Sequence, residues 1–160
     1  MRDDMDRRTM RGWAFVGVQG LCFLAVAVTA FLGDIGPALW SNLAASLALV
    51  VIGSAGVLWA GRDLGKALTP SPVPNEAGLV ARGIYRHARH PMYSSLVVIC
   101  LGVAVGSGAF LCYLSIAVLA AFFMLKARVE ESYLLGAYDG YAEYGARTGR
   151  FLPGLGHLGG

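Results

Sequence analysis

The chain alternates between long apolar runs and polar segments, and this pattern predicts an all-α polytopic membrane protein. A helix that crosses a bilayer needs about 20 consecutive apolar residues. The apolar run from Pro91 to Leu125 is too long for one span, and Gly106-Ser107-Gly108 interrupts it, so we expect a helical hairpin there. In total we expect four membrane-spanning helices, over about residues 12–32, 38–60, 91–106 and 109–126.

Two polar segments complete what we expect to be a single domain over residues 1–160. They are the loop 61–90 and the tail 127–160. The tail is amphipathic, and we expect it to be helical at first and frayed over residues 154–160. Because the connections on the opposite side of the membrane are short, any chemistry must use the loop, the tail and the helix ends beside them.

The distribution of charge agrees with this topology. All 13 Lys and Arg residues lie in the N-terminal arm, in the loop 61–90 or in the tail from Lys126 onward. The positive-inside rule therefore places both termini and the loop in the cytoplasm. The Ala-, Gly-, Arg- and Val-rich composition suits a GC-rich bacterium, so we expect an integral protein of a bacterial inner membrane.

Composition excludes several classes of protein. Hydrophobic residues make up 56% of the 160 residues and the mean hydropathy is +0.59, which is too apolar for a soluble domain of this size. The net charge of +3 gives little support for nucleic-acid binding. The cysteines Cys22, Cys100 and Cys112 are scattered through apolar runs without metal-ligand spacing, so we expect no metal site and interpret them as small core residues.

The densest group of chemically active residues lies just before the third predicted span. Arg86, Arg89 and His90 precede Pro91, which fits the first position of a helix because it lacks an N–H group. Free N–H groups at that helix start, together with the cations, would attract a carboxylate or a phosphate. The alternative is a basic collar that binds lipid headgroups.

Two further groups follow the fourth span. Glu130 and Glu131 are adjacent on a helix, so we expect at most one of them to face inward, where the arginines of the loop could pair with it. Tyr138, Tyr141 and Tyr144 recur every three residues, which predicts that they lie on one side of a short helix. These tyrosines either anchor the tail at the membrane interface or line a cofactor pocket.

These segments together resemble the isoprenylcysteine carboxyl methyltransferase and phospholipid methyltransferase superfamily. The first part of the resemblance is carried by Leu68-Thr69-Pro70-Ser71-Pro72-Val73-Pro74, Gly78-Leu79-Val80 and Gly83-x-Tyr85-Arg86-x-x-Arg89-His90-Pro91-x-Tyr93. The second part is Arg128-x-Glu130-Glu131-x-x-Leu134-Leu135, Tyr141-x-x-Tyr144-x-x-Arg147 and Arg150-Phe151-Leu152-Pro153. The chain departs from the family at Tyr138-Asp139-Gly140, one residue shorter than the usual Phe-Gly segment, and the first two spans match only in hydropathy.

The resemblance implies an integral-membrane methyltransferase that uses S-adenosylmethionine bound in a cytoplasm-facing pocket. Carried over motif by motif, it assigns cofactor binding to Tyr85, Arg86, Arg89, His90, Pro91, Tyr93, Glu131, Leu134, Tyr141 and Tyr144. It assigns catalysis to Glu130, Glu131 and Arg147.

The chemistry of these residues fits the cofactor. Arg89, His90 and the helix start suit its carboxylate, a glutamate suits its ammonium, and tyrosine faces suit adenine or the sulfonium. A G-x-G-x-x-G motif that follows a strand, as in soluble dinucleotide-binding domains, is missing from the sequence.

The acceptor stays open at this stage. We expect a hydrophobic small molecule or a lipidated acceptor that enters sideways from the bilayer and offers a carboxylate, an amine or a thiol; the oligomeric state is open as well. Two alternatives compete with a methyltransferase. One is an NADPH-dependent reductase of related fold, although such enzymes have more spans, and the other is a non-catalytic lipid-binding or assembly protein.

Overall fold

The computed structural model describes residues 2–32, 36–73 and 78–159, with residues 2–9 described by their helical backbone only. The turn residues Asp34 and Ile35 and the proline Pro74 therefore lie outside the described residues. The helices are α1 (Arg2–Phe31), α2 (Leu43–Leu64), the 3-10 helices η1 (Gly65–Ala67) and η2 (Gly83–Arg86), α3 (Pro91–Ser107), α4 (Phe110–Ala137) and α5 (Tyr141–Arg147).

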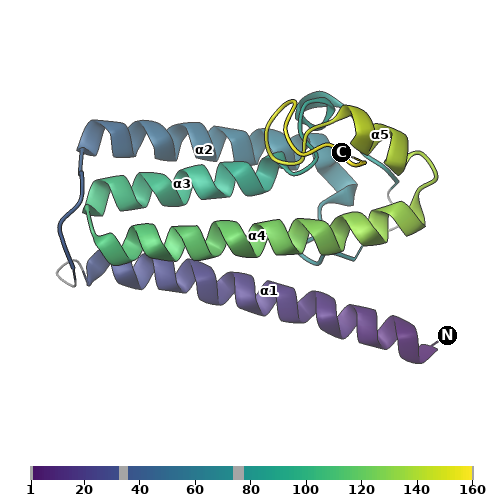
Figure 1. The fold of residues 1–160 in the computed structure, drawn as a ribbon, viewed down its shortest axis with the longest axis horizontal. Coiled ribbons are helices and arrows are strands. Elements are labelled where there is room, and N and C mark those ends of the chain that lie inside the picture. Colours follow the sequence, from purple (N-terminus) through teal and green to yellow (C-terminus); the bar gives the residue numbers. More distant parts are fainter. Residues whose placement is uncertain (1, 33–35, 74–77, 160) are drawn as a thin grey trace.

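Four of these helices form the membrane bundle, which confirms the predicted fold class. Three segments are long and apolar enough to span a bilayer, Met10–Phe31, Leu43–Ala67 and Phe110–Ala137, and α3 is a shorter apolar helix. The long helices lie side by side in the order α2, α3, α4 and α1 (Figure 1). Helix α5 and both labelled chain ends lie at one end of this bundle, which we call the site end (Figure 1).

Several helix boundaries differ from the expected spans; α1 already begins at Arg2 and α2 ends at Leu64. Helix α2 starts at Leu43 instead of residue 38, because the Asn42 side chain caps it by accepting a hydrogen bond from the Ala45 N–H at 2.8 Å. The preceding Leu39 and Asn42 donate backbone hydrogen bonds to the hairpin between α3 and α4. Helix α4 continues to Ala137, since no proline interrupts it, so the predicted tail begins as part of a membrane helix.

Helices α2 and α3 pack closely through small residues. A Cβ atom added at Gly102 would lie 2.8 Å from Val50 Cγ2 and 3.0 Å from the backbone oxygen of Ser46. A Cβ atom at Gly106 would lie 2.7 Å from Ser46 Oγ, and one at Gly53 would lie 2.8 Å from the backbone oxygen of Ser95. Glycines on both helices thus bring the two backbones together. This close contact holds the start of α3 against the end of α2.

Helix α4 supplies the centre of the hydrophobic core. Its Leu119 and Phe123 are fully buried and pack in one cluster with Val26 of α1 and Ala104 of α3. The core therefore fixes α4 between α1 and α3, and it extends to the site end through Phe123, which stacks on Tyr93 at the first turn of α3.

Candidate functional site

The backbone just before α3 is held from two sides. On one side, the Ile84 N–H donates a 2.8 Å hydrogen bond to Asp63 at the end of α2, and Gly83 adopts a φ of +56°, where a side chain would be strained. On the other side, the C-terminal tail runs parallel to residues 88–90. The N–H groups of Arg89 and His90 donate to the backbone oxygens of Gly149 and Arg150 at 2.8 and 2.9 Å.

Arg89 is a latch for the C-terminal tail. Its Nε donates to Glu131 at 2.8 Å, and its two Nη atoms donate to backbone oxygens of the tail, those of Gly145 (2.9 Å), Thr148 and Gly156 (2.9 Å). Four hydrogen bonds occupy most of a guanidinium that carries five N–H donors. Arg89 therefore holds the C-terminal tail in place, and its predicted role in holding a ligand carboxylate stays a prediction.

The same contacts correct the expectation of a frayed C-terminus. The backbone oxygen of Gly156 accepts from Arg89, and the Leu158 N–H donates to Gly145 at 3.0 Å. Leu155 exchanges backbone hydrogen bonds with Leu152 and Arg150. The sequence suggested fraying because this segment is rich in glycine, whereas the latch and these backbone bonds hold it against the body of the protein.

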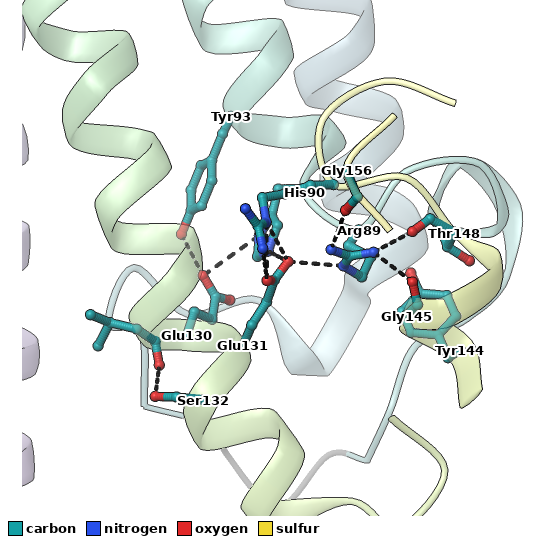
Figure 2. Close-up of polar contacts among 12 residues, drawn as sticks. Arg89, His90, Tyr93, Glu130, Glu131, Ser132, Tyr144, Gly145, Thr148 and Gly156 are labelled. Atoms are coloured by element: carbon teal, nitrogen blue, oxygen red, sulfur yellow. Dashed lines mark hydrogen bonds and ion pairs between the residues drawn. The ribbon is translucent and has the colours of Figure 1, made fainter. Parts of the chain in front are cut away.

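Glu131 is the centre of a buried ion cluster. Its side chain is 3% exposed and accepts hydrogen bonds from Arg89 at 2.8 Å and from Arg150 Nη2 at 2.8 Å. The Nε2 atom of His90 lies 3.1 Å from the same carboxylate (Figure 2). Two guanidinium groups compensate the buried negative charge, and the carboxylate in turn orients the His90 ring. Arg150 belongs to one of the family motifs in the sequence, but it was not among the predicted site residues.

Glu130 reaches His90 from the other side of the ring. The Tyr93 hydroxyl donates to Glu130 at 2.7 Å, and His90 Nδ1 lies 3.8 Å from the same carboxylate. The rings of His90 and Tyr93 stack at 5.3 Å with an angle of 2° between their planes. The prediction that only one glutamate faces inward was wrong, since the short turn at the start of α3 lies across the α4 surface where both carboxylates emerge (Figure 2).

A pocket opens beside this cluster at the site end. It encloses about 810 Å³ of space, the solvent at its mouth included. Of the residues predicted from the sequence, those that line it are Tyr85, Arg89, His90, Tyr93, Glu130, Leu134, Tyr141 and Tyr144. The wall is completed by Tyr138, for which the sequence left pocket lining open, and by residues that the prediction left out: Leu64, Ala67, Leu68, Thr69, Ser71, Pro72, Val73, Gly78, Leu79, Val80 and Met92. Several of these residues belong to the proline-rich motif of residues 68–74. That motif was the sequence signal from which they could have been predicted.

Three tyrosines give this pocket neutral hydroxyl groups. The Tyr144 hydroxyl donates to the backbone oxygen of Tyr85 at 2.6 Å, and burial raises the pKa of Tyr144 to about 12. Burial also raises the pKa of Tyr85 and Tyr141 above the ordinary range. Among the described residues, the Tyr141 hydroxyl is a buried side-chain group that has no hydrogen-bond partner. Because an unpaired buried hydroxyl is costly, it marks a place where a ligand can bond.

Four predicted site residues lie outside the pocket lining. Pro91 is buried at the first position of α3, and Glu131 lies behind His90 in the ion cluster. Arg86 is exposed on η2. Arg147 has a side chain that is 73% exposed and pairs with Glu143 on the outer face of α5. The structure thus does not bring Arg86 and Arg147 together with the other candidates.

Comparison with known protein families gives a match. The family model described as phospholipid methyltransferase matches residues 41–140, which include α2, α3, α4 and the whole Arg89-to-Glu131 cluster except Arg150. Helix α1 and helix α5 lie outside the matched residues. Among the curated proteins, none matches the chain.

Proposed function

Because the chain belongs to the phospholipid methyltransferase family, we propose that it transfers a methyl group from S-adenosylmethionine to a hydrophobic or lipid-like acceptor. The family implies membrane methyltransferase activity on lipid-like substrates and generally uses this donor. The reaction would take place at the cytoplasmic face of a bacterial inner membrane. The observation that carries the proposal is the pocket that joins an unpaired buried Tyr141 hydroxyl to the Glu130 carboxylate.

The lining of the pocket fits this donor. S-adenosylmethionine supplies, when bound, an electrophilic methyl group on a positively charged sulfur. Glu130 offers a carboxylate for positive charge, and the rings of Tyr141 and Tyr144, which meet edge to face at 5.7 Å, offer faces for an aromatic or cationic group. The Tyr141 hydroxyl has no hydrogen-bond partner within the described part of the chain and could bond a polar atom of the donor. Leu64, Leu68, Val80 and Leu134 supply the apolar remainder.

The residues around the pocket would act mainly by positioning the reactants. Methyl transfer is a displacement in line, so alignment of donor and acceptor and exclusion of water supply several kcal/mol. The ion cluster of Arg89, Glu131 and Arg150 holds His90 in place and closes the C-terminal tail over this region. We therefore propose Glu131 as a positioning residue and Glu130 as the group that faces the reactants.

Glu130 would also handle the acceptor proton. A carboxylate acceptor needs no general base, whereas an amine or a thiol must first lose a proton. Glu130 is the carboxylate that lines the pocket, and the Tyr93 hydroxyl at 2.7 Å fixes one of its oxygens while the other stays available. The structure supports this role by position alone, and the chemical class of the acceptor remains open among these three.

The acceptor would reach the pocket from the bilayer. Leu64 of α2 and Met92 of α3 line the pocket at the ends of membrane helices, so apolar surface continues from the spans to the reaction site. A lipid-like molecule can keep its chain in the hydrocarbon region while its polar end enters the pocket. Methylation restricted to water-soluble acceptors would contradict this part of the proposal.

The decisive experiment is calorimetric titration of the detergent-purified protein with S-adenosylhomocysteine. We expect micromolar binding by the wild type and its loss in His90→Ala. The matched control is His87→Ala, which removes an exposed histidine three residues earlier and should leave binding unchanged. No binding by a folded wild type would overturn the proposal and favour a non-catalytic membrane protein, and preferential binding of NADPH would favour a reductase.

A further inference from the structure

A buried lysine lies outside the proposed reaction site but contacts three groups around it: a glutamine of α1, the backbone beside the pocket wall and a tyrosine of the pocket. Lys126 of α4 is 1% exposed, and its Nζ donates to Gln19 Oε1 of α1 at 2.5 Å and to the backbone oxygen of Pro70 at 2.9 Å. The third direction points to the face of the Tyr93 ring, whose centroid lies 5.3 Å from Nζ. An ammonium group has three donors, and all three find an acceptor here.

This arrangement is unusual because no carboxylate forms a close ion pair with the charge; Glu130, four residues further along α4, acts on it only at longer range. Among the described residues, the ion pairs within 4.0 Å do not include Lys126. Burying a cation beside membrane helices costs free energy that neutral acceptors offset only in part. A leucine or a methionine would fill the same space at a lower free-energy cost of burial. We therefore look for the role of Lys126 in the contacts that its ammonium group makes.

The bond to Pro70 secures one wall of the pocket. Thr69, Ser71, Pro72 and Val73 line the pocket, and Pro72 is among the most buried side chains. Within this segment the hydrogen bonds are local and long, from the Ser71 N–H to Thr69 Oγ1 and from the Val73 N–H to Ser71 Oγ, each 3.3 Å. Lys126 therefore ties the backbone of residues 69–73 to α4.

The bond to Gln19 brings α1 into the same assembly. Gly12 of α1 also lies against this wall, since a Cβ atom added there would collide with Ser71 Oγ and lie 3.3 Å from Val73 Cγ2. Helix α1 lies outside the residues matched by the family model, and none of its described side chains lines the pocket. Its route to the pocket runs through Lys126 and the segment 69–73.

We propose that Lys126 is a positioning residue that couples α1 to the donor pocket. The inference rests on the proposed function, since it assumes that the pocket binds the methyl donor. Lys126 holds the segment 69–73 against the pocket, and its ammonium group lies over the ring of Tyr93, whose hydroxyl donates to Glu130. Donor affinity then depends on the hydrogen bond between Gln19 of α1 and Lys126 of α4, although the donor itself touches neither residue.

The test measures S-adenosylhomocysteine affinity by calorimetry in detergent for four proteins: the wild type, Lys126→Met, Gln19→Leu and Thr29→Val. A charged hydrogen bond is worth about 1.5–3 kcal/mol, so Lys126→Met should weaken binding by at least about tenfold, and Gln19→Leu should do so by a smaller factor. Thr29→Val is the matched control, because Thr29 Oγ1 donates to Ser115 Oγ of α4 at 3.2 Å, far along α1 from the pocket. Its affinity should equal that of the wild type.

The combined variant separates coupling from general loosening. If Gln19 acts through Lys126, the double variant Gln19→Leu/Lys126→Met should bind no more weakly than Lys126→Met alone. Additive losses, an unchanged affinity in Lys126→Met, or an equal loss in Thr29→Val would each overturn the inference.

Two further outcomes keep the test decisive. If Lys126→Met does not fold, Gln19→Leu carries the test, and an affinity equal to that of the wild type then overturns the inference. Failure of the wild type to bind would instead count against the proposed function.

Discussion

The buried carboxylate of Glu131 allows a sharp test of what holds the site together. We consider Glu131→Gln, which keeps the size of the side chain and removes its charge. In the wild type this carboxylate lies between the guanidinium groups of Arg89 and Arg150, with its side chain 3% exposed. The amide would leave the buried Arg89 and the partly buried Arg150 without a counter-charge and would turn N–H donors toward other donors.

The expected cost follows from burial. Removing one partner of a buried ion pair costs about 3–5 kcal/mol, because the remaining charge stays desolvated. Glu143→Gln is the matched control, since it removes the same charge from a pair with Arg147 in which both side chains are more than 70% exposed. An exposed pair four residues apart contributes about 0.3–0.5 kcal/mol. The two substitutions should therefore differ about tenfold in their effect on the free energy of unfolding.

Thermal unfolding in detergent, followed by tryptophan fluorescence, measures this difference. For a chain of this length 1 kcal/mol corresponds to about 2–4 °C, so Glu131→Gln should lower the melting temperature by roughly 6–20 °C and Glu143→Gln by about 2 °C or less. Limited proteolysis of Glu131→Gln should also release the C-terminal tail, since Arg89 would lose its anchor on α4. Equal melting temperatures for the two variants would refute the reasoning.

Three further predictions concern catalysis, pH and packing. Glu130→Gln should slow methyl transfer to an amine or thiol acceptor by about 100-fold or more while S-adenosylhomocysteine affinity changes little, as steady-state rates with labelled donor and calorimetry will show. Because the pKa of Tyr144 is raised from about 10 to about 12, its neutral form contributes stability that is fully present below pH 10 and is lost as the pH rises toward 12. Tyr144→Phe should therefore reduce the loss of stability in that window, measured by alkaline unfolding. Gly102→Leu should destabilise the protein by about 1–3 kcal/mol through overpacking against α2, whereas Gly17→Ala, where nothing lies within 4 Å, should be neutral in thermal unfolding.

Each of these three has a result that contradicts it. Rates of Glu130→Gln equal to those of the wild type would remove this residue from proton transfer. Identical alkaline unfolding in Tyr144→Phe would mean that this hydroxyl does not titrate in the stated window. A melting temperature of Gly102→Leu equal to that of the wild type would mean that α2 and α3 separate at little cost.

The sequence by itself determined the membrane fold, the family and most of the candidate residues. Span length and hydropathy are local properties, so four helices could be read from apolar runs with errors of only a few residues at most ends. The motifs around His90 and Glu130 are local as well, and the family match confirms the resemblance that they carry.

Only the tertiary structure decided what each candidate residue does. Arg89 and Arg147 are both arginines in matching motifs, yet one is a buried latch and the other an exposed partner of Glu143. The same holds for Glu130 and Glu131, adjacent in the chain, of which one lines the pocket and the other forms ion pairs with two arginines. Lys126 looked like the first charge of the tail, and its link to Gln19, 107 residues earlier, could not be read from any local pattern. The physical reason is that charge and hydrogen bonding are decided by burial and by partners distant in the chain, which depend on how the helices pack.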